Sequence, residues 1–576
     1  MLIKQAGILG KITFIVQPNH AFLPLLAETC VITSDQLSFM LNYGKVAPII
    51  LSIEEVNMYM KNWLKGLTLS LALSSVALAT PDAHAVDQFT DYLKTQHHFA
   101  HQHIDGADVL VLPVAEGGLV LPQKWSDAAK QIITDAVALE GFEGKQGQFL
   151  ELLALPEFYA KRLWLVGTGT ELERAAAERI GATLASKLSD KMNTVVVHGK
   201  DLNPNQIAAI AHGMDLRSYR FDRYKSEPAA RPEYTVHWHG RDEAAAKAAY
   251  ALTQPVAHGI FVARDITNLP GGDGYPKAIA EMAAEAVANY DIKATVYSPE
   301  QVKELGMGAL YGVSQGSQHK AHLLVLEYQG GAANEAPIAL VGKGNTFDTG
   351  GYNLKTSGSS IVRMQTDKAG GAAVIGAVMA LAGQQAKVNV AGVVPLSHNL
   401  ISGTALLPGD VVVTGDGTRV EVVNTDAEGR LILADGIWFA RDQLKARAIA
   451  DIATLTGSKA RALGTDYAAI FSEHDALIGA MQAAGELTEE QVWQLPLGPY
   501  DGIIDSWLAD VQNVGSPGAQ AGARFLQHFA KDTPWIHIDM AANAYSTSAK
   551  GIHPAGANGY GVRLLSEWVK NYSDAE

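Results

Sequence analysis

Residues 424–435 read NTDAEGRLILAD, and this stretch places two carboxylates and an arginine directly before an apolar run. Charged side chains are seldom buried unless they pair with an opposite charge or bind a metal. Ala427 and Gly429 add no bulk, so the backbone and both acids can come close to something small. One interpretation is an ordinary helix start, in which Asp426 and Glu428 complement the helix dipole. The other is a binding site, and the rest of the chain has to distinguish the two.

Apolar runs and helical stretches alternate on both sides of these residues, which favours an α/β fold. Two domains are expected: a smaller N-terminal α/β domain over residues 86–245, and a larger C-terminal α/β domain over 246–576. The larger one has strand-like runs that are apolar on both faces, as in a central, mostly parallel sheet covered by helices. Strands are predicted at 108–114, 162–168, 194–199, 336–342, 387–395, 446–455 and 535–541, and helices at 125–138, 171–189, 244–268 and 372–385.

The composition is that of an ordinary globular protein, with 48% hydrophobic and 18% charged residues among 576. The formal net charge of -15 argues against a general nucleic-acid binder and against binding to an anionic membrane. No nucleic acid partner and no stable membrane association are therefore expected.

The N-terminal region contains a pattern typical of a signal peptide. Residues 60–65 are basic, an apolar run follows, and Ala83 and Ala85 form an A-x-A cleavage site. We therefore expect a signal peptide at 60–85 and an exported protein, periplasmic or secreted. Residues 1–59 would then be a start-site misassignment or an extension. The alternative is a cytoplasmic protein in which the 60–85 signal is not used.

A second charged, glycine-rich segment lies at residues 341–351, VGKGNTFDTGG, and carries Lys343 and Asp348 after a predicted strand. Asp367 follows before a helix, so each acid stands where open α/β sheets place their ligands. If Asp348 and Asp367 converge with the two acids of residues 424–435, four carboxylates need strong compensation. Two divalent cations would provide it, and oxygen ligands suit Mn or Zn. The alternative, in which each segment is a separate exposed loop, stays open.

VGKGNTFDTGGYNLK and NTDAEGRLILAD strongly resemble the motifs of the leucyl aminopeptidase family. Members are two-metal exopeptidases of hexameric α/β architecture, and the similarity runs from about residue 255 to the C-terminus. The resemblance implies a metal-dependent aminopeptidase that releases N-terminal amino acids from peptides. The first peptide bond would be attacked by a hydroxide that two metals activate. The larger domain would be catalytic, and a homohexamer with peptide substrates is expected.

The same resemblance implies a set of metal ligands. Asp348 and Glu428 would bridge the two metals, Lys343 and Asp367 would complete the more labile site, and Asp426 the tighter one. Lys343 would have to bind as the neutral amine, which requires a lowered pKa.

It also implies the residues that act on the substrate. Lys355 would polarise the scissile carbonyl, and Arg430 would hold a bicarbonate ion that serves as the general base. Backbone groups around Leu455 and Gly457 would grip the substrate. Met364 matches a wall of the pocket for the first side chain.

The chain departs from the family pattern around Asp367. The segment 355–367 is one residue longer than usual, and Lys368 and Ala369 stand where Met and a small residue are expected. A displaced Asp367 would loosen one metal site and shift substrate preference. Two alternatives stand beside this function: DNA binding, as in some members of the family, and a metal-binding paralogue without activity. The complete set of predicted metal and catalytic residues counts against the second.

Overall fold

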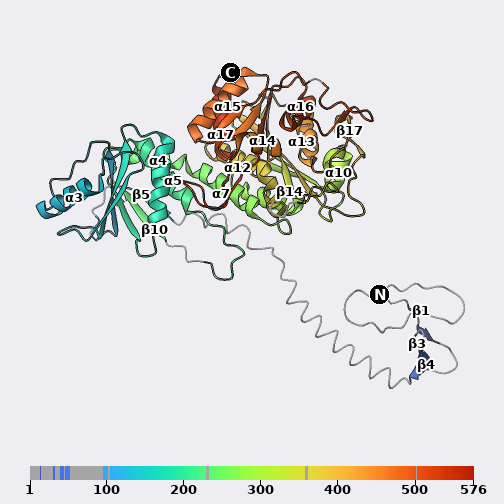
Figure 1. Ribbon diagram of the computed structural model, residues 1–576, viewed down its shortest axis with the longest axis horizontal. Helices are drawn as coiled ribbons and strands as arrows, with labels where there is room; N and C mark the ends of the chain where they lie inside the picture. The colour runs from blue at the N-terminus through green and yellow to red at the C-terminus, as the bar shows by residue number, and fades with distance from the viewer. Residues whose placement is uncertain are drawn as a thin grey trace. The chain divides into compact units, whose positions relative to one another are not determined.

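The protein is described by a computed structural model (Figure 1), in which residues 1–84 and 85–576 form two separate compact units. The residues that it describes are 13–14, 30–32, 39–43, 46–51, 95–100, 104, 106–228, 233–356, 361–500 and 502–575. The first unit contains an antiparallel sheet of β1 (Thr13–Phe14), β2 (Cys30–Ile32), β3 (Phe39–Tyr43) and β4 (Val46–Leu51). The signal peptide predicted at 60–85 lies outside the described residues. In the described part of the chain, no helix is both long and apolar enough to cross a membrane.

The second unit begins with a six-stranded sheet in the order β5-β10-β9-β6-β8-β7, parallel except for β7. Its strands are β5 (Thr95–Phe99), β6 (Val109–Ala115), β7 (Phe149–Leu153), β8 (Arg162–Gly169), β9 (Thr194–Val197) and β10 (Tyr234–Trp238). Its helices are α3 (Asp127–Glu140), α4 (Arg174–Lys187) and α5 (Pro204–Ser218).

The helix predicted over residues 244–268 is in fact two helices, α6 (Glu243–Ala251) and α7 (Gln254–Asn268). Pro255 stands in the first turn of α7, where its missing N–H costs no hydrogen bond. The single-helix prediction was wrong because proline fits the start of a helix but not its interior. α7 then packs against α12 (Ala369–Gly383) of the larger domain.

The larger domain is built on a sheet of nine described strands in the order β11-β12-β15-β13-β18-β22-β19-β20, with β14 beside β15. The pairs at its centre, from β15 through β13 and β18 to β22, are parallel. The predicted two-domain α/β fold with a mostly parallel central sheet is thus confirmed. The strands are β11 (Ile292–Tyr297), β12 (His322–Gln329), β13 (Ile338–Gly342), β14 (Gly344–Asp348), β15 (Asn389–Asn399), β18 (Ala448–Ala453), β19 (Ala468–Phe471), β20 (Val492–Gln494) and β22 (Trp535–Asp539).

Helices cover both faces of this sheet (Figure 1), and each layer has its own apolar core. One core includes residues of α7, α8 (Pro276–Ala286), α12, α15 (Asp475–Thr488) and α17 (Val562–Ala575). The other includes residues of α9 (Pro299–Glu304), α10 (Gly308–Ser314), α13 (Glu428–Trp438) and α16 (Gly518–Ala530). Leu431, Ile432 and Leu433 are fully buried in this second core, so the apolar run after the acids anchors the start of α13.

The remaining elements are short. β16 (Val411–Val413), β17 (Arg419–Glu421) and β21 (Val511–Gln512) form a small sheet. β23 (Tyr545–Ser546) pairs with β24 (Gly556–Ala557), and the rest are η1 (Met364–Lys368), η2 (Phe439–Gln443) and α14 (Gly457–Leu463).

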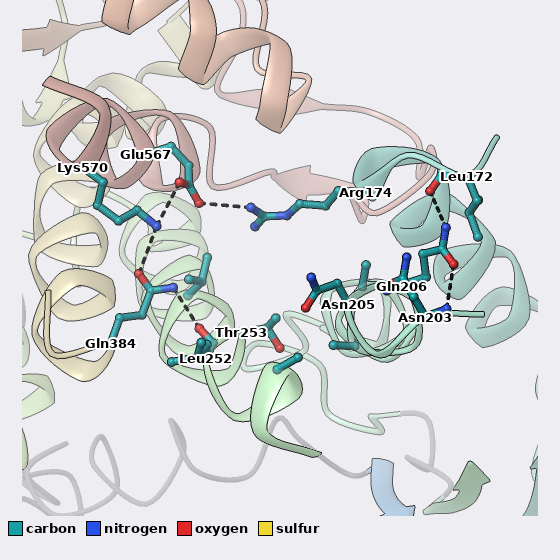
Figure 2. A pocket seen from close by; sticks show the side chains of 14 residues that line it. Leu172, Arg174, Asn203, Asn205, Gln206, Leu252, Thr253, Gln384, Glu567 and Lys570 are labelled. Atoms are coloured by element: carbon teal, nitrogen blue, oxygen red, sulfur yellow. Dashed lines mark hydrogen bonds and ion pairs between the residues drawn. The ribbon is translucent and has the colours of Figure 1, made fainter. Parts of the chain in front are cut away.

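A polar cavity of about 440 Å³ lies between the two domains (Figure 2). Arg174 of α4 reaches across it to Glu567 of α17, which also pairs with Lys570. Gln384 receives a hydrogen bond from Lys570 and donates one to the carbonyl of Leu252. The charged groups around this cavity pair with one another, so the cavity lies at a junction between the domains. The residues of the two sequence motifs do not line it.

Candidate metal centre

The predicted ligands gather at the carboxyl edge of the central parallel strands. Lys343 lies between β13 and β14, and Asp348 is the last residue of β14. Asp367 is in η1, directly before α12, and Glu428 is the first residue of α13. Open α/β sheets bind their ligands at this edge. Residues 424–435 thus contain a helix start, as one interpretation expected, and Glu428 at that start converges with two other acids.

Three of the carboxylates converge. One oxygen each from Asp348, Asp367 and Glu428 lies within 4.8 Å of the others, and all three side chains are buried. Carboxylates this close and this buried repel one another unless cations lie between them.

Lys343 supplies one such cation. Its Nζ is 2.9 Å from Asp367 Oδ1 and 2.9 Å from Glu428 Oε1, and it donates to the carbonyl of Thr454 at 3.0 Å. Gly429 makes room for it, because a Cβ at that position would lie 2.6 Å from Lys343 Nζ. The absence of a side chain at Gly429 thus permits the close approach that the sequence indicated.

The charges of this cluster shift its pKa values in opposite directions. Burial by itself would lower the pKa of Lys343, but Asp367, Glu428 and Asp348 outweigh it and hold the pKa above its ordinary value. Burial raises the pKa of Asp367 to about 6, although Lys343 opposes the shift. For Glu428, burial would raise the pKa, but Lys343 and Lys355 outweigh it and lower the pKa. Without a metal, Lys343 is therefore an ammonium group, not the neutral amine that a ligand must be.

Lys355 bridges the other side of the cluster. Its Nζ is 2.8 Å from Asp348 Oδ2 and also pairs with Asp426 Oδ1. Asp348 Oδ1 accepts hydrogen bonds from the backbone N–H of Gly350 and from Asn399, each at 2.8 Å. Burial, with the charge of Glu428, raises the pKa of both Asp348 and Asp426. Asp426 is the outermost acid, with a side chain 33% exposed.

Arg430 lies in the first turn of α13, where it is buried, and its Nε has no hydrogen-bond partner among the residues that the structure describes. Burial lowers the pKa of Arg430 to about 10, opposed by Glu428 and Asp539, and the side chain remains a cation. A buried guanidinium with an unused N–H beside an acidic cluster is suited to hold a small anion.

The predicted substrate-binding residues lie around the cluster. Leu455 and Gly457 follow Thr454, and the backbone N–H of Leu455 donates to Asp539 Oδ1 at 3.2 Å. Asp539 also accepts from the hydroxyl of Thr456 at 2.6 Å, so it shapes this loop. Gly457 is exposed at the start of α14. Met364 is half-buried at the start of η1, three residues before Asp367.

Three polar side chains of the centre are not among the residues predicted from the sequence. Asn345 Nδ2 donates to Asp367 Oδ2 at 3.0 Å and to Glu428 Oε1 at 3.1 Å. Thr454 Oγ1 donates to Asp367 Oδ1 at 2.8 Å, and Asn399 is the donor to Asp348 described above. Asn345 lies inside a motif that was singled out, between Lys343 and Asp348, so its position was a usable signal.

A buried centre with more carboxylates than ammonium groups defines a protein that binds divalent cations. The catalytic domain of the cytosol aminopeptidase family matches residues 261–566, and the N-terminal domain of that family matches residues 111–228. The chain belongs to this family. It is a metal-dependent aminopeptidase, a hydrolase, and divalent metal ions are its cofactors.

Two relatives are similar to this chain over more than three quarters of its length. A probable cytosol aminopeptidase 1 of Shewanella oneidensis is 43% identical over 459 residues, which are 78% of this chain and 90% of that protein. A probable cytosol aminopeptidase of a Bradyrhizobium species is 40% identical and covers 77% of this chain and 90% of its own length.

A similar solved structure is that of the bottromycin maturation enzyme BotP in complex with Mn. It has a TM-score of 0.72 and 29% sequence identity, and it covers 82% of this chain and all of that one.

These relatives overturn the predicted export. They are named cytosol aminopeptidases, which favours the cytoplasmic alternative, so the expectation of a periplasmic or secreted protein was wrong. The signal-peptide pattern consists of lysines, common apolar residues and two alanines, and such a pattern can occur without directing export.

Proposed function

We propose that the enzyme holds two divalent cations with Lys343, Asp348, Asp367, Asp426 and Glu428. The observation that carries this proposal is the charge of the centre. Four carboxylates face the ammonium groups of Lys343 and Lys355 and the nearby guanidinium of Arg430, so the acids outnumber the cations in a largely buried place. Two divalent cations would reverse that excess and also replace the proton of Lys343.

When bound, the cations would polarise the substrate carbonyl and lower the pKa of a water molecule. The chain's own residues then orient the reaction. Lys355 is held at the centre by Asp348 and Asp426, so its ammonium group is placed to stabilise negative charge on the scissile carbonyl oxygen. Arg430 has a free Nε–H with which to hold a bicarbonate ion as general base.

The substrates are peptides with a free N-terminal amino group. The loop from Thr454 to Gly457 is fixed to Asp539, so its backbone groups can align the substrate beside Asp367. Met364 would form a wall of the pocket for the first side chain. We further propose Mn or Zn as the cations and a homohexamer as the assembly, with no nucleic acid partner and no stable membrane association.

The test is hydrolysis of leucine amide and other aminoacyl amides by the full chain, with Mn or Zn added and after treatment with a chelator. We expect metal-dependent release of the amino acid, abolished in an Asp426→Ala, Glu428→Ala double variant. Asp127→Ala, at a fully exposed carboxylate of α3, is the control and should keep its activity.

Two further measurements test the number of metal sites and the oligomeric state. Metal titration should give two sites per chain, and native mass spectrometry should give six chains per particle. No release by folded, metal-loaded protein from any aminoacyl amide would overturn the proposal.

A further inference from the structure

Lys368 lies inside the larger domain, and only 1% of its surface is exposed. Lysine is almost never buried to this extent unless its ammonium group is paired or fully hydrogen-bonded. It directly follows Asp367 in η1.

The ammonium group of Lys368 donates to three backbone carbonyls. These belong to Leu269 at 2.8 Å, Gln365 at 2.6 Å and Thr346 at 3.3 Å. An ammonium group has three N–H donors, so its hydrogen bonds are all used. No carboxylate is needed to hold this lysine.

The three carbonyls come from three different segments. Thr346 lies in β14, two residues before Asp348, and Gln365 lies in η1, two residues before Asp367. Leu269 ends α7 and begins the loop to α8. Lys368 thus joins the two backbone segments that carry these metal ligands, and it ties both to a helix that packs on α12.

We propose that Lys368 is a positioning residue of the metal centre, which holds the segment of Asp367 against the segment of Asp348. This inference rests on the proposed metal ligands. It also gives a role to the lysine that stands where the family pattern leads one to expect methionine. Residues behind the ligands of a metal commonly change metal affinity by about 10–100-fold when they are replaced.

A methionine at this position would fill a similar volume but donate nothing. The carbonyls of Leu269, Gln365 and Thr346 would then lose their shared donor. β14 and η1 would lose a tie that supplements the hydrogen bond from Asn345 to Asp367, and the site that needs both Asp348 and Asp367 would bind its cation more weakly. Asp426 lies on the other side of the cluster and is not tied to Lys368 by any contact seen here, so the second site should change less.

The test is isothermal titration calorimetry. The chelator-treated full chain is titrated with Mn²⁺ for wild type, Lys368→Met and Lys368→Gln. In Lys368→Met we expect the affinity of the weaker site to fall about 10–100-fold while the tighter site changes less than threefold. Lys368→Gln retains two N–H donors, so its affinity should lie between the other two. Lys368→Gln takes the place of Lys368→Met in this test if Lys368→Met does not fold.

Lys459 offers a matched control, because it is also fully buried and has only oxygen acceptors. Its Nζ donates to the carbonyls of Gly464 at 3.1 Å and Ala541 at 2.8 Å, and to the side chain of Asn543. Lys459→Met removes the same chemistry from a place that carries no metal ligand. We expect it to lower the melting temperature but to leave both Mn²⁺ affinities unchanged.

The outcomes separate this inference from the proposed function. Unchanged Mn²⁺ affinities in Lys368→Met, with a wild type that binds two ions, would overturn the positioning role alone. An equal fall in Lys459→Met would also overturn it, because any buried lysine would then matter. A wild type that binds no Mn²⁺ would overturn both.

Discussion

Buried charges occur at the domain junction and at the metal centre, and the two places differ in balance. At the junction, Arg174 and Arg563 face Glu178 and Glu567, with Arg563 donating to Glu178 at 2.7 Å. Burial would raise the pKa of Glu178, but the two arginines outweigh it and lower the pKa. At the metal centre the acids are in excess, and burial raises the pKa of Asp367 to about 6.

The difference teaches how to recognise a site among buried charges. A balanced cluster is complete by itself and holds two domains together. A cluster with surplus carboxylates needs a bound cation to balance its charge. Its residues favour cation binding and destabilise the metal-free fold.

The largest expected effect comes from removing one charge of the metal centre. Asp348→Asn should lower kcat/KM at least about 1000-fold, or about 4 kcal/mol, because the proposed bridging ligand is lost. The folded-state pKa of Asp348 is raised, so its ionised form opposes folding at neutral pH. The free energy of unfolding of the metal-free variant should therefore fall by less than about 1 kcal/mol. Steady-state kinetics and urea unfolding check both parts, and near-normal kinetics would remove Asp348 from the ligand set.

The junction should respond in the opposite way. Glu178→Ala leaves Arg563 buried without its partner, and it should lower the free energy of unfolding by about 3 kcal/mol. The activity of the folded variant should stay within about twofold of wild type, because Glu178 stands in α4, outside the segments that carry the proposed ligands. A Glu178→Leu, Arg563→Met variant should lose less stability than the single variant. Urea unfolding measures the difference, and a larger loss in the double variant would contradict the balance argument.

Metal affinity should depend on pH in a direction set by Lys343. Its pKa in the metal-free protein is raised above its ordinary value by the surrounding acids, so it is protonated at pH 6–8. As the proposed ligand, Lys343 would have to be the neutral amine, so binding would release a proton and the metal affinity should rise up to about tenfold per pH unit. Calorimetry in two buffers of different ionisation enthalpy counts the released protons. A pH-independent affinity would show that Lys343 keeps its proton.

The smallest effect concerns His212 of α5, which is fully buried beside the junction. Burial lowers its pKa to about 4, although Glu178 opposes the shift. Because the folded-state pKa lies below the unfolded value of 6.5, the unfolded chain binds the proton first as the pH falls. Stability should therefore decrease from pH 6.5 towards 4. Between pH 7 and 5.5, wild type should lose about 1 kcal/mol more than His212→Leu. Equal losses in thermal unfolding would contradict this.

Part of the centre was predictable from local patterns. The alternation of strands and helices gave the fold class, and the loops after strands gave Lys343, Asp348, Asp367 and Glu428. Asn345 and Thr454 could not be found in the same way. Thr454 lies 111 residues from Lys343, and their contact depends on the parallel pairing of β13 with β18.

The sequence by itself determined the α/β architecture, the apolar anchor after Arg430 and the acidic residues at the loop ends, because side-chain periodicity and glycine positions act over a few residues. Only the tertiary structure decided that these acids outnumber their cations in one buried place, that Arg430 Nε is left free, and that Lys368 ties two ligand segments together. Those properties arise from segments far apart in the chain, which meet only when the central sheet forms.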